Sequence, residues 1–325
     1  MNYQTQLLTL IKHKKVRSKI MRKQEVRFKS SDIELSATLA LPDTPGPYIG
    51  VVLVAGSGPI DRDENHARIK LNVFRDISQF LASQGIATLR YDKRGVGESG
   101  GDYFSAGFND NSADALAALE TLRVQKDIDA DRLFILGHSE GAHIATKLAG
   151  SGARACGAIL LAGAAKTGEE TLKWQALKVA DGLKGLSGWI IRTFHIDVAK
   201  AQQKQIDRIK KSGKDWIRVQ FVKLNAKWFR EFMAYDPSAD FPRITMPVLA
   251  ITGSKDIQVD PTDLERMAGL VKAPFEGHLI DGMTHMLRVQ EKEAVVANYR
   301  EEVKRPVDPG MLGIIAGWIK KQAGV

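Results

Sequence analysis

The feature that most constrains this chain is a short apolar run that leads directly into a Gly-x-Ser-x-Gly turn. Residues 133–136 read Leu-Phe-Ile-Leu, residues 137–141 read Gly-His-Ser-Glu-Gly, and a helical pattern follows. A serine on a sharp strand-to-helix turn needs small neighbours, because its backbone is strained and the helix packs closely on the strand. Gly137 and Gly141 meet that need. The segment therefore predicts a nucleophilic Ser139 raised above the edge of a sheet.

Predicted strands and helices alternate along most of the chain. Residues 25–41 alternate apolar and polar side chains about a turn, which predicts a hairpin. We predict further strands at residues 49–54, 86–91, 132–137, 157–162, 248–252 and 275–280. We predict helices at residues 70–84, 111–125, 140–149, 261–271 and 309–321. This alternation indicates a mostly parallel central sheet with helices on both faces.

The alternation stops between residues 165 and 240, where we predict helices and no strand. This stretch carries four of the five Trp, and fifteen Lys or Arg against nine Asp or Glu. We interpret 165–240 as a helical lid inserted into one α/β core made of 24–164 and 241–325. Its aromatic side chains either roof an acyl pocket or only seat the lid on the core. Its positive charge fits an anionic leaving group such as coenzyme A, or a solvated surface equally well.

The N-terminal segment 1–23 is strongly basic. Seven Lys or Arg precede the first acid, Glu25, in a chain whose net charge is +9. We interpret this segment as solvated, with weak contact to a membrane surface as the alternative. No apolar run approaches the ~20 residues of a spanning helix. A single cysteine excludes an internal disulfide, which fits a reducing compartment, and we predict a cytoplasmic protein.

The order of these motifs resembles the α/β-hydrolase superfamily along residues 25–322. Two further stretches resemble its bacterial serine esterase and acyl-hydrolase branch: residues 56–63, Gly-Ser-Gly-Pro-Ile-Asp-Arg-Asp, and residues 91–99, Tyr-Asp-Lys-Arg-Gly-Val-Gly-Glu-Ser. The resemblance implies an α/β-hydrolase fold with a helical lid. It also implies a catalytic triad in the chain order serine, acid, histidine.

The acid of such a triad follows a late strand. A serine hydroxyl is a poor nucleophile at neutral pH and needs a base, which in turn needs an orienting acid. The strand predicted at 248–252 leads into a loop that ends at Asp256, which is our candidate acid. Asp260 is the competitor, but it precedes Pro261 and would serve well as the N-cap of the next helix.

Seven histidines compete for the role of base, and the resemblance favours His285. It lies in a loop just after the strand predicted at 275–280. His278 lies inside that strand, and His138 adjoins Ser139, so the two side chains should project apart. The others lie in the basic segment, in the insertion, or before the acid in the chain: His13, His195, His66 and His143.

Two backbone N–H groups must stabilise the oxyanion of the tetrahedral intermediate. Glu140, the residue after the nucleophile, should supply one. Ser57, in the loop after the first parallel strand, should supply the other, with Gly58 as the alternative; a tight turn alone would also explain the glycines of that loop. The adjoining Asp-Arg-Asp at 61–63 is interpreted as an anchor for the loop rather than a substrate contact.

These residues predict a serine hydrolase that cleaves carboxylic esters through an acyl-enzyme intermediate. The sequence has no clustered metal ligands and no Gly-x-Gly-x-x-Gly after the first parallel strand, so we expect no metal and no cofactor. An acyl-CoA thioesterase, an amide or peptide hydrolase, and a non-catalytic binding protein of the same fold remain alternatives. We expect a small-molecule acyl ester as ligand and no nucleic acid partner. Acyl length and oligomeric state are not predicted.

Overall fold

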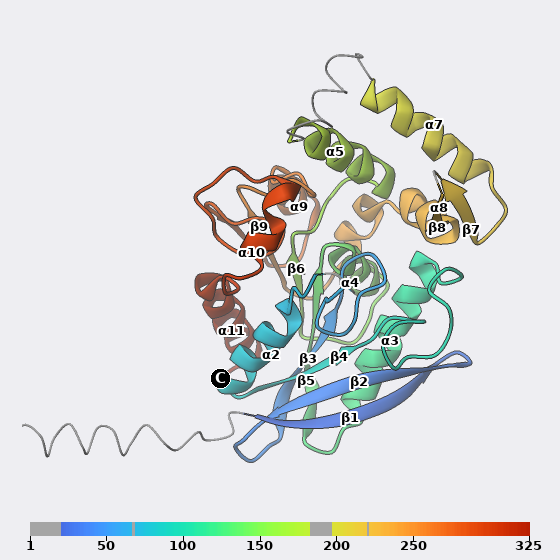
Figure 1. Ribbon diagram of the computed structural model, residues 1–325. Coiled ribbons are helices and arrows are strands. Elements are labelled where there is room, and N and C mark those ends of the chain that lie inside the picture. Colours follow the sequence, from blue (N-terminus) through green and yellow to red (C-terminus); the bar gives the residue numbers. More distant parts are fainter. Residues whose placement is uncertain (1–20, 67–68, 183–196, 220) are drawn as a thin grey trace, which may run out of the picture.

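The computed structural model describes residues 21–66, 69–182, 197–219 and 221–325 (Figure 1). Its centre is an eight-stranded sheet in the order β1-β2-β4-β3-β5-β6-β9-β10. The strands are β1 (Met21–Ser30), β2 (Ile33–Pro42), β3 (Tyr48–Val54), β4 (Ile86–Tyr91), β5 (Ile128–His138), β6 (Gly157–Leu161), β9 (Val248–Gly253) and β10 (Phe275–Ile280). β2 pairs antiparallel with β1 and β4, and all other neighbours are parallel. The prediction of a mostly parallel sheet is confirmed.

Helices cover both faces of this sheet, as the sequence predicts. The helices of the core are α2 (Val73–Ser83), α3 (Phe108–Arg123), α4 (Glu140–Gly150), α9 (Asp263–Leu270), α10 (Tyr299–Glu302) and α11 (Pro309–Ala323), with 3-10 turns η2 (Pro237–Ala239), η3 (Phe241–Arg243) and η4 (Val296–Asn298). Successive residues of β3 point to opposite faces and so join two hydrophobic cores. Val51 packs with α2 and α11, whereas Val52 packs with α3 and α4.

The first hairpin forms as predicted but begins earlier than expected. β1 starts at Met21, and Arg22 and Lys23 pair with residues of β2. We predicted that both residues belong to the basic segment 1–23, because two adjacent charges give no strand pattern. Lysines and arginines are nevertheless well tolerated in a strand at the edge of a sheet. Residues 1–20 lie outside the described part of the chain, so the solvated segment stays a prediction.

Residues 165–240 contain helices α5 (Gly168–Asp181), α7 (Val198–Lys211) and α8 (Ala226–Ala234). They lie over the edge of the sheet where α4 begins (Figure 1). They also contain a hairpin of β7 (Trp216–Val219) and β8 (Val222–Asn225), so the expectation of no strand here is wrong. Strands of four residues are too short for an alternating pattern to stand out. No helix of the described chain has both the length and the hydropathy needed to cross a bilayer.

Candidate active site

Ser139 lies on a sharp turn between β5 and α4. Its φ of 56° and ψ of −117° are strained for a residue with a side chain. A Cβ atom on Gly137 would overlap the backbone of Gly141, and a Cβ atom on Gly141 would overlap the carbonyl group of Val54. Only glycine fits at both positions. The close packing of strand and helix therefore holds Ser139 at the end of the sheet, at the N-terminus of α4.

The structure brings Ser139 together with Asp256 and His285. Nε2 of His285 lies 3.0 Å from Oγ of Ser139, and Nδ1 of His285 lies 2.8 Å from Oδ2 of Asp256. The other oxygen of Asp256 accepts the N–H groups of Gln258 at 2.7 Å and Val259 at 2.9 Å, which fixes the orientation of the carboxylate. Both His285 and Asp256 are buried. This geometry allows a proton to move from the serine hydroxyl to the imidazole.

The competing candidates lie in other networks. Asp260 pairs with Lys166 and accepts the N–H of Thr262. α9 begins at Asp263, two residues later than predicted, and Thr262 is its N-cap. Asp260 accepts the N–H groups of Thr262 and Asp263, so it caps the turn that leads into this helix rather than the helix itself. His278 lies in β10, as predicted, and contacts Glu276 at 2.8 Å. In the described residues, no three His, Cys, Asp or Glu side chains are grouped to hold a metal ion.

Glu140 and Ser57, whose backbone N–H groups are the predicted oxyanion donors, lie next to Ser139. Glu140 is the first residue of α4, where N–H groups have no partner within the helix. Ser57 lines a small cavity together with Ser139, whereas Gly58 does not line it. The N–H of Gly56, one residue earlier, donates to Oε1 of Glu64 at 2.8 Å. This bond holds the loop after β3 beside the nucleophile.

Glu64 and His138 form a buried pair beside Ser139 that sequence reasoning missed. Nδ1 of His138 lies 2.8 Å from Oε2 of Glu64, and Nε2 lies 3.0 Å from the backbone oxygen of His285. His138 has no bond to the Ser139 hydroxyl, but it lines the same cavity. Burial by itself would lower the pKa of His138; the charge and hydrogen bond of Glu64 outweigh it, so this pKa is raised.

A second buried network surrounds the Glu140 side chain. Nζ of Lys93 lies 2.9 Å from Oε2 of Glu140 and also donates to the backbone oxygen of Gly56. Oε1 of Glu140 accepts hydrogen bonds from Asn111 in α3 and from the indole N–H of Trp228 in α8, both at 2.8 Å. The positive charge of Lys93 offsets the negative charge of a carboxylate that is buried next to Ser139.

The segment at 61–63 anchors its loop, as predicted from the sequence. Nη2 of Arg62 lies 2.8 Å from Oδ2 of Asp92, and Nη1 lies 2.6 Å from Glu25. Asp63 pairs with the buried Arg90 at 2.6 Å. Burial would raise the pKa of Asp92, but the hydrogen bonds from Arg62 outweigh burial, and the pKa is lowered. These ion pairs join the loop to β1 and to the end of β4.

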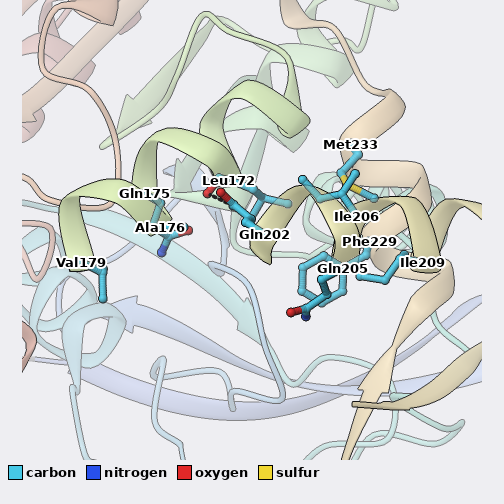
Figure 2. Close-up of a pocket in the computed structure, with 10 residues that line it drawn as sticks. All are labelled: Leu172, Gln175, Ala176, Val179, Gln202, Gln205, Ile206, Ile209, Phe229 and Met233. Carbon is cyan, nitrogen blue, oxygen red and sulfur yellow. Dashed lines mark hydrogen bonds between the residues drawn. The ribbon is translucent and has the colours of Figure 1, made fainter. Parts of the chain in front are cut away.

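A hydrogen bond links a residue that lines the cavity at Ser139 to a residue that lines a second, larger cavity. The cavity at Ser139 has a volume of about 100 Å³ and is lined by Gly56, Ser57, Ile60, Glu64, Leu71, His138, Ser139, Gln258, His285 and Met286. A larger cavity of about 320 Å³ lies between α5, α7 and α8, and Figure 2 shows its mostly apolar lining. Gln175 of this cavity donates to Oε1 of Gln258 at 3.0 Å.

Comparisons with known proteins agree with this architecture. The family described as serine aminopeptidase, S33, matches residues 70–293. Esterase EstD from Thermotoga maritima is 31% identical over 302 residues, which cover 90% of this chain and 68% of that protein. Est1E from Butyrivibrio proteoclasticus has a TM-score of 0.61 at 17% identity, covering 93% of this chain and 99% of that chain. The Pyrococcus furiosus esterase Pf2001 has a TM-score of 0.60 at 17% identity, covering 93% of this chain and 91% of that chain. The chain therefore belongs to the S33 family of α/β hydrolases.

Proposed function

We propose that this protein is a serine hydrolase that cleaves carboxylic esters through an acyl-enzyme intermediate. The observation that carries the proposal is the line of hydrogen bonds from Ser139 through His285 to Asp256, at 3.0 and 2.8 Å. Similarity to Esterase EstD supports an ester as the substrate. The division into a core and a lid at residues 165–240 is part of the same proposal.

The reaction begins when Oγ of Ser139 attacks the ester carbonyl carbon and its proton passes to Nε2 of His285. Asp256 holds the ring and stabilises the imidazolium. The N–H groups of Ser57 and Glu140 donate to the oxyanion of the tetrahedral intermediate. His285 then protonates the leaving alkoxide, which departs and leaves an acyl group on Ser139. A water molecule, deprotonated by the same imidazole, hydrolyses the acyl-enzyme.

The cavity at Ser139 favours a neutral ester over the substrate of an aminopeptidase. An aminopeptidase must hold the positively charged amino group of its substrate, and a carboxylate is the usual partner for such a group. Apart from the triad, Glu64 is the one carboxylate among the residues that line this cavity. The two carboxylate oxygens of Glu64 already interact with the N–H of Gly56 and with Nδ1 of His138. The cavity thus offers no available partner for an ammonium group.

The same cavity favours a short acyl chain. Its volume of about 100 Å³ is comparable to that of only a few water molecules. We therefore expect acetyl and butyryl esters to be hydrolysed faster than octanoyl esters. Gln258 closes the side of the cavity that faces Gln175 of the lid.

A panel of p-nitrophenyl esters, acyl-CoA thioesters and aminoacyl p-nitroanilides tests the proposal. We expect kcat/KM to be highest for the short esters, and Ser139→Ala to lower kcat by at least roughly 10⁴-fold. Ser83→Ala, which changes an exposed serine at the end of α2, is the matched control and should keep full activity. A fluorophosphonate probe should label the wild type and the control but not Ser139→Ala. A wild type that is inactive on every substrate and unlabelled would refute the proposal.

A further inference from the structure

The β7–β8 hairpin of the lid exposes large apolar side chains at its tip. Ile217 and Leu224 face each other across the strands and pack into a small core with α7 and α8. The next pair on the same face, Val219 and Val222, extends past that core, and Val222 is 65% exposed. Phe221, in the turn, is fully exposed. Burying such a side chain elsewhere would be favourable by about 1.5–3 kcal/mol, so the tip is suited to contact an apolar phase.

Positive charge is dense on the hairpin and on the adjoining helix α7. Residues 198–230 contain ten Lys or Arg against two Asp. Eight of these cations are exposed: Lys200, Lys204, Arg208, Lys210, Lys211, Lys214, Arg218 and Lys223. Arg218 and Lys223 lie directly opposite each other on the two strands. Like charges in that position destabilise a hairpin, and a bound anion would relieve their repulsion.

The hairpin also combines aromatic and cationic groups as proteins do at a lipid–water boundary. Nζ of Lys223 lies 3.9 Å from the ring centroid of Phe104 and 4.8 Å from that of Trp216. Trp216 is 42% exposed. Aromatic rings with one polar end, and lysines whose stems cover apolar surface, both suit this boundary.

The base of the hairpin is fastened to the core. Nδ2 of Asn225 donates to the backbone oxygens of Tyr103, at 2.5 Å, and Ala106, at 2.7 Å. Nη2 of Arg208 in α7 donates to the backbone oxygen of Arg218 at 3.1 Å. The base of the hairpin and the backbone of Arg218 are therefore tied to the core and to α7, so that docking need not order this part of the chain.

We propose that the β7–β8 hairpin and the exposed face of α7 dock on an anionic phospholipid bilayer. Phe221 and Val222 enter the headgroup region, and the cations contact lipid phosphates. A second copy of the chain does not fit this face, because two such positive surfaces repel. A nucleic acid would match the cations, but it would leave the aliphatic Val222 without a partner. The inference is independent of the proposed ester hydrolysis.

Sedimentation of the full chain with lipid vesicles tests this surface. We expect binding to vesicles that contain phosphatidylglycerol, little binding to phosphatidylcholine alone, and weakening by salt. Replacing both apolar tip residues, Phe221→Ser with Val222→Ser, should lower the vesicle affinity roughly tenfold or more. Replacing the opposed cations, Arg218→Gln with Lys223→Gln, should lower it roughly fivefold per charge removed.

Val124→Ser is the matched control, because it removes a valine that is 78% exposed beyond the end of α3. It should bind vesicles as the wild type does. The N-terminal cations are present in every variant, so their contribution cancels. Hydrolysis of a soluble short ester, or a thermal melt if the chain is inactive, checks that each variant is folded. The proposal is overturned if the hairpin variants bind vesicles like the wild type. It is also overturned if they lose binding only to single-stranded DNA, or lose only self-association.

Discussion

The carboxylate of Glu64 lies 2.8 Å from Nδ1 of His138, and this pair links the two loops on either side of the reactive serine. Glu64 holds the N–H of Gly56 in the loop after β3, and Nε2 of His138 lies beside the backbone oxygen of His285. A carboxylate and a carbonyl are both acceptors, so this geometry favours a proton on each ring nitrogen of His138. That assignment agrees with the raised pKa of His138.

Removal of the Glu64 carboxylate should impair catalysis more than substrate binding. In Glu64→Ala the N–H of Gly56 loses its acceptor, and the neighbouring N–H of Ser57 loses its fixed direction. We expect kcat to fall roughly 10²-fold, the usual effect of losing one oxyanion donor, with KM little changed. Glu64→Gln keeps an acceptor for Gly56 and should retain most of the activity. Steady-state kinetics would contradict this role if Glu64→Ala kept the wild-type kcat.

The His138–Glu64 pair should make stability depend on pH. The pKa of His138 is raised in the folded state. The pair therefore contributes fully below the unfolded pKa of about 6.5, and the contribution is lost as the pH rises through the folded pKa. Urea unfolding of the wild type and of His138→Gln measures it. The difference in unfolding free energy should be larger near about pH 6 than near about pH 9. If the difference in unfolding free energy between the wild type and His138→Gln were equal at both pH values, the imidazole ring of His138 would not be charged in the folded protein.

The Lys93–Glu140 pair should show strong coupling. Both side chains are buried, so Lys93→Met leaves an unpaired carboxylate beneath the nucleophile. We expect a loss of about 3–5 kcal/mol in the free energy of unfolding. Adding Glu140→Gln should restore much of it, because an amide oxygen can still accept from Asn111 and Trp228. Urea unfolding of the four proteins gives the coupling energy. Additive effects of the two changes would argue against a direct pair.

Gln258 should limit the length of the acyl chain. Its side chain lines the small cavity at Ser139 and accepts a hydrogen bond from Gln175, which lines the larger cavity between α5, α7 and α8. Gln258→Ala keeps the hydrogen bond from the backbone N–H of residue 258 to Asp256 and opens the small cavity towards the larger one. We expect the kcat/KM ratio of octanoyl to acetyl esters to rise roughly tenfold. Gln175→Ala, which breaks the same hydrogen bond but keeps the Gln258 side chain, is the control and should change the ratio less. An unchanged ratio in Gln258→Ala would place the acyl chain elsewhere.

The amino-acid sequence by itself determined the features that depend on local sterics and on strand order. The apolar run before Gly137 specifies a buried strand, and the two glycines specify the tight turn at Ser139. The resemblance to the α/β-hydrolase superfamily pointed to Asp256 and His285 through the chain order that it implies. They can meet Ser139 because the carboxyl ends of parallel strands lie at one edge of the sheet. The sheet, its covering helices and the three residues now seen together all follow from such signals.

Only the tertiary structure decided which distant side chains support this site. Glu64 and His138 are 74 residues apart, and Trp228 is 88 residues from Glu140. The spacing of apolar and polar residues along the chain does not predict such pairs, because each pair depends on how separate segments pack. The charged run that contains Glu64 follows the loop after β3 directly, but its composition is equally typical of a solvated turn. The short β7–β8 hairpin was missed for a related reason: strands of four residues carry too little pattern, and these strands are stabilised by contacts with α7 and α8.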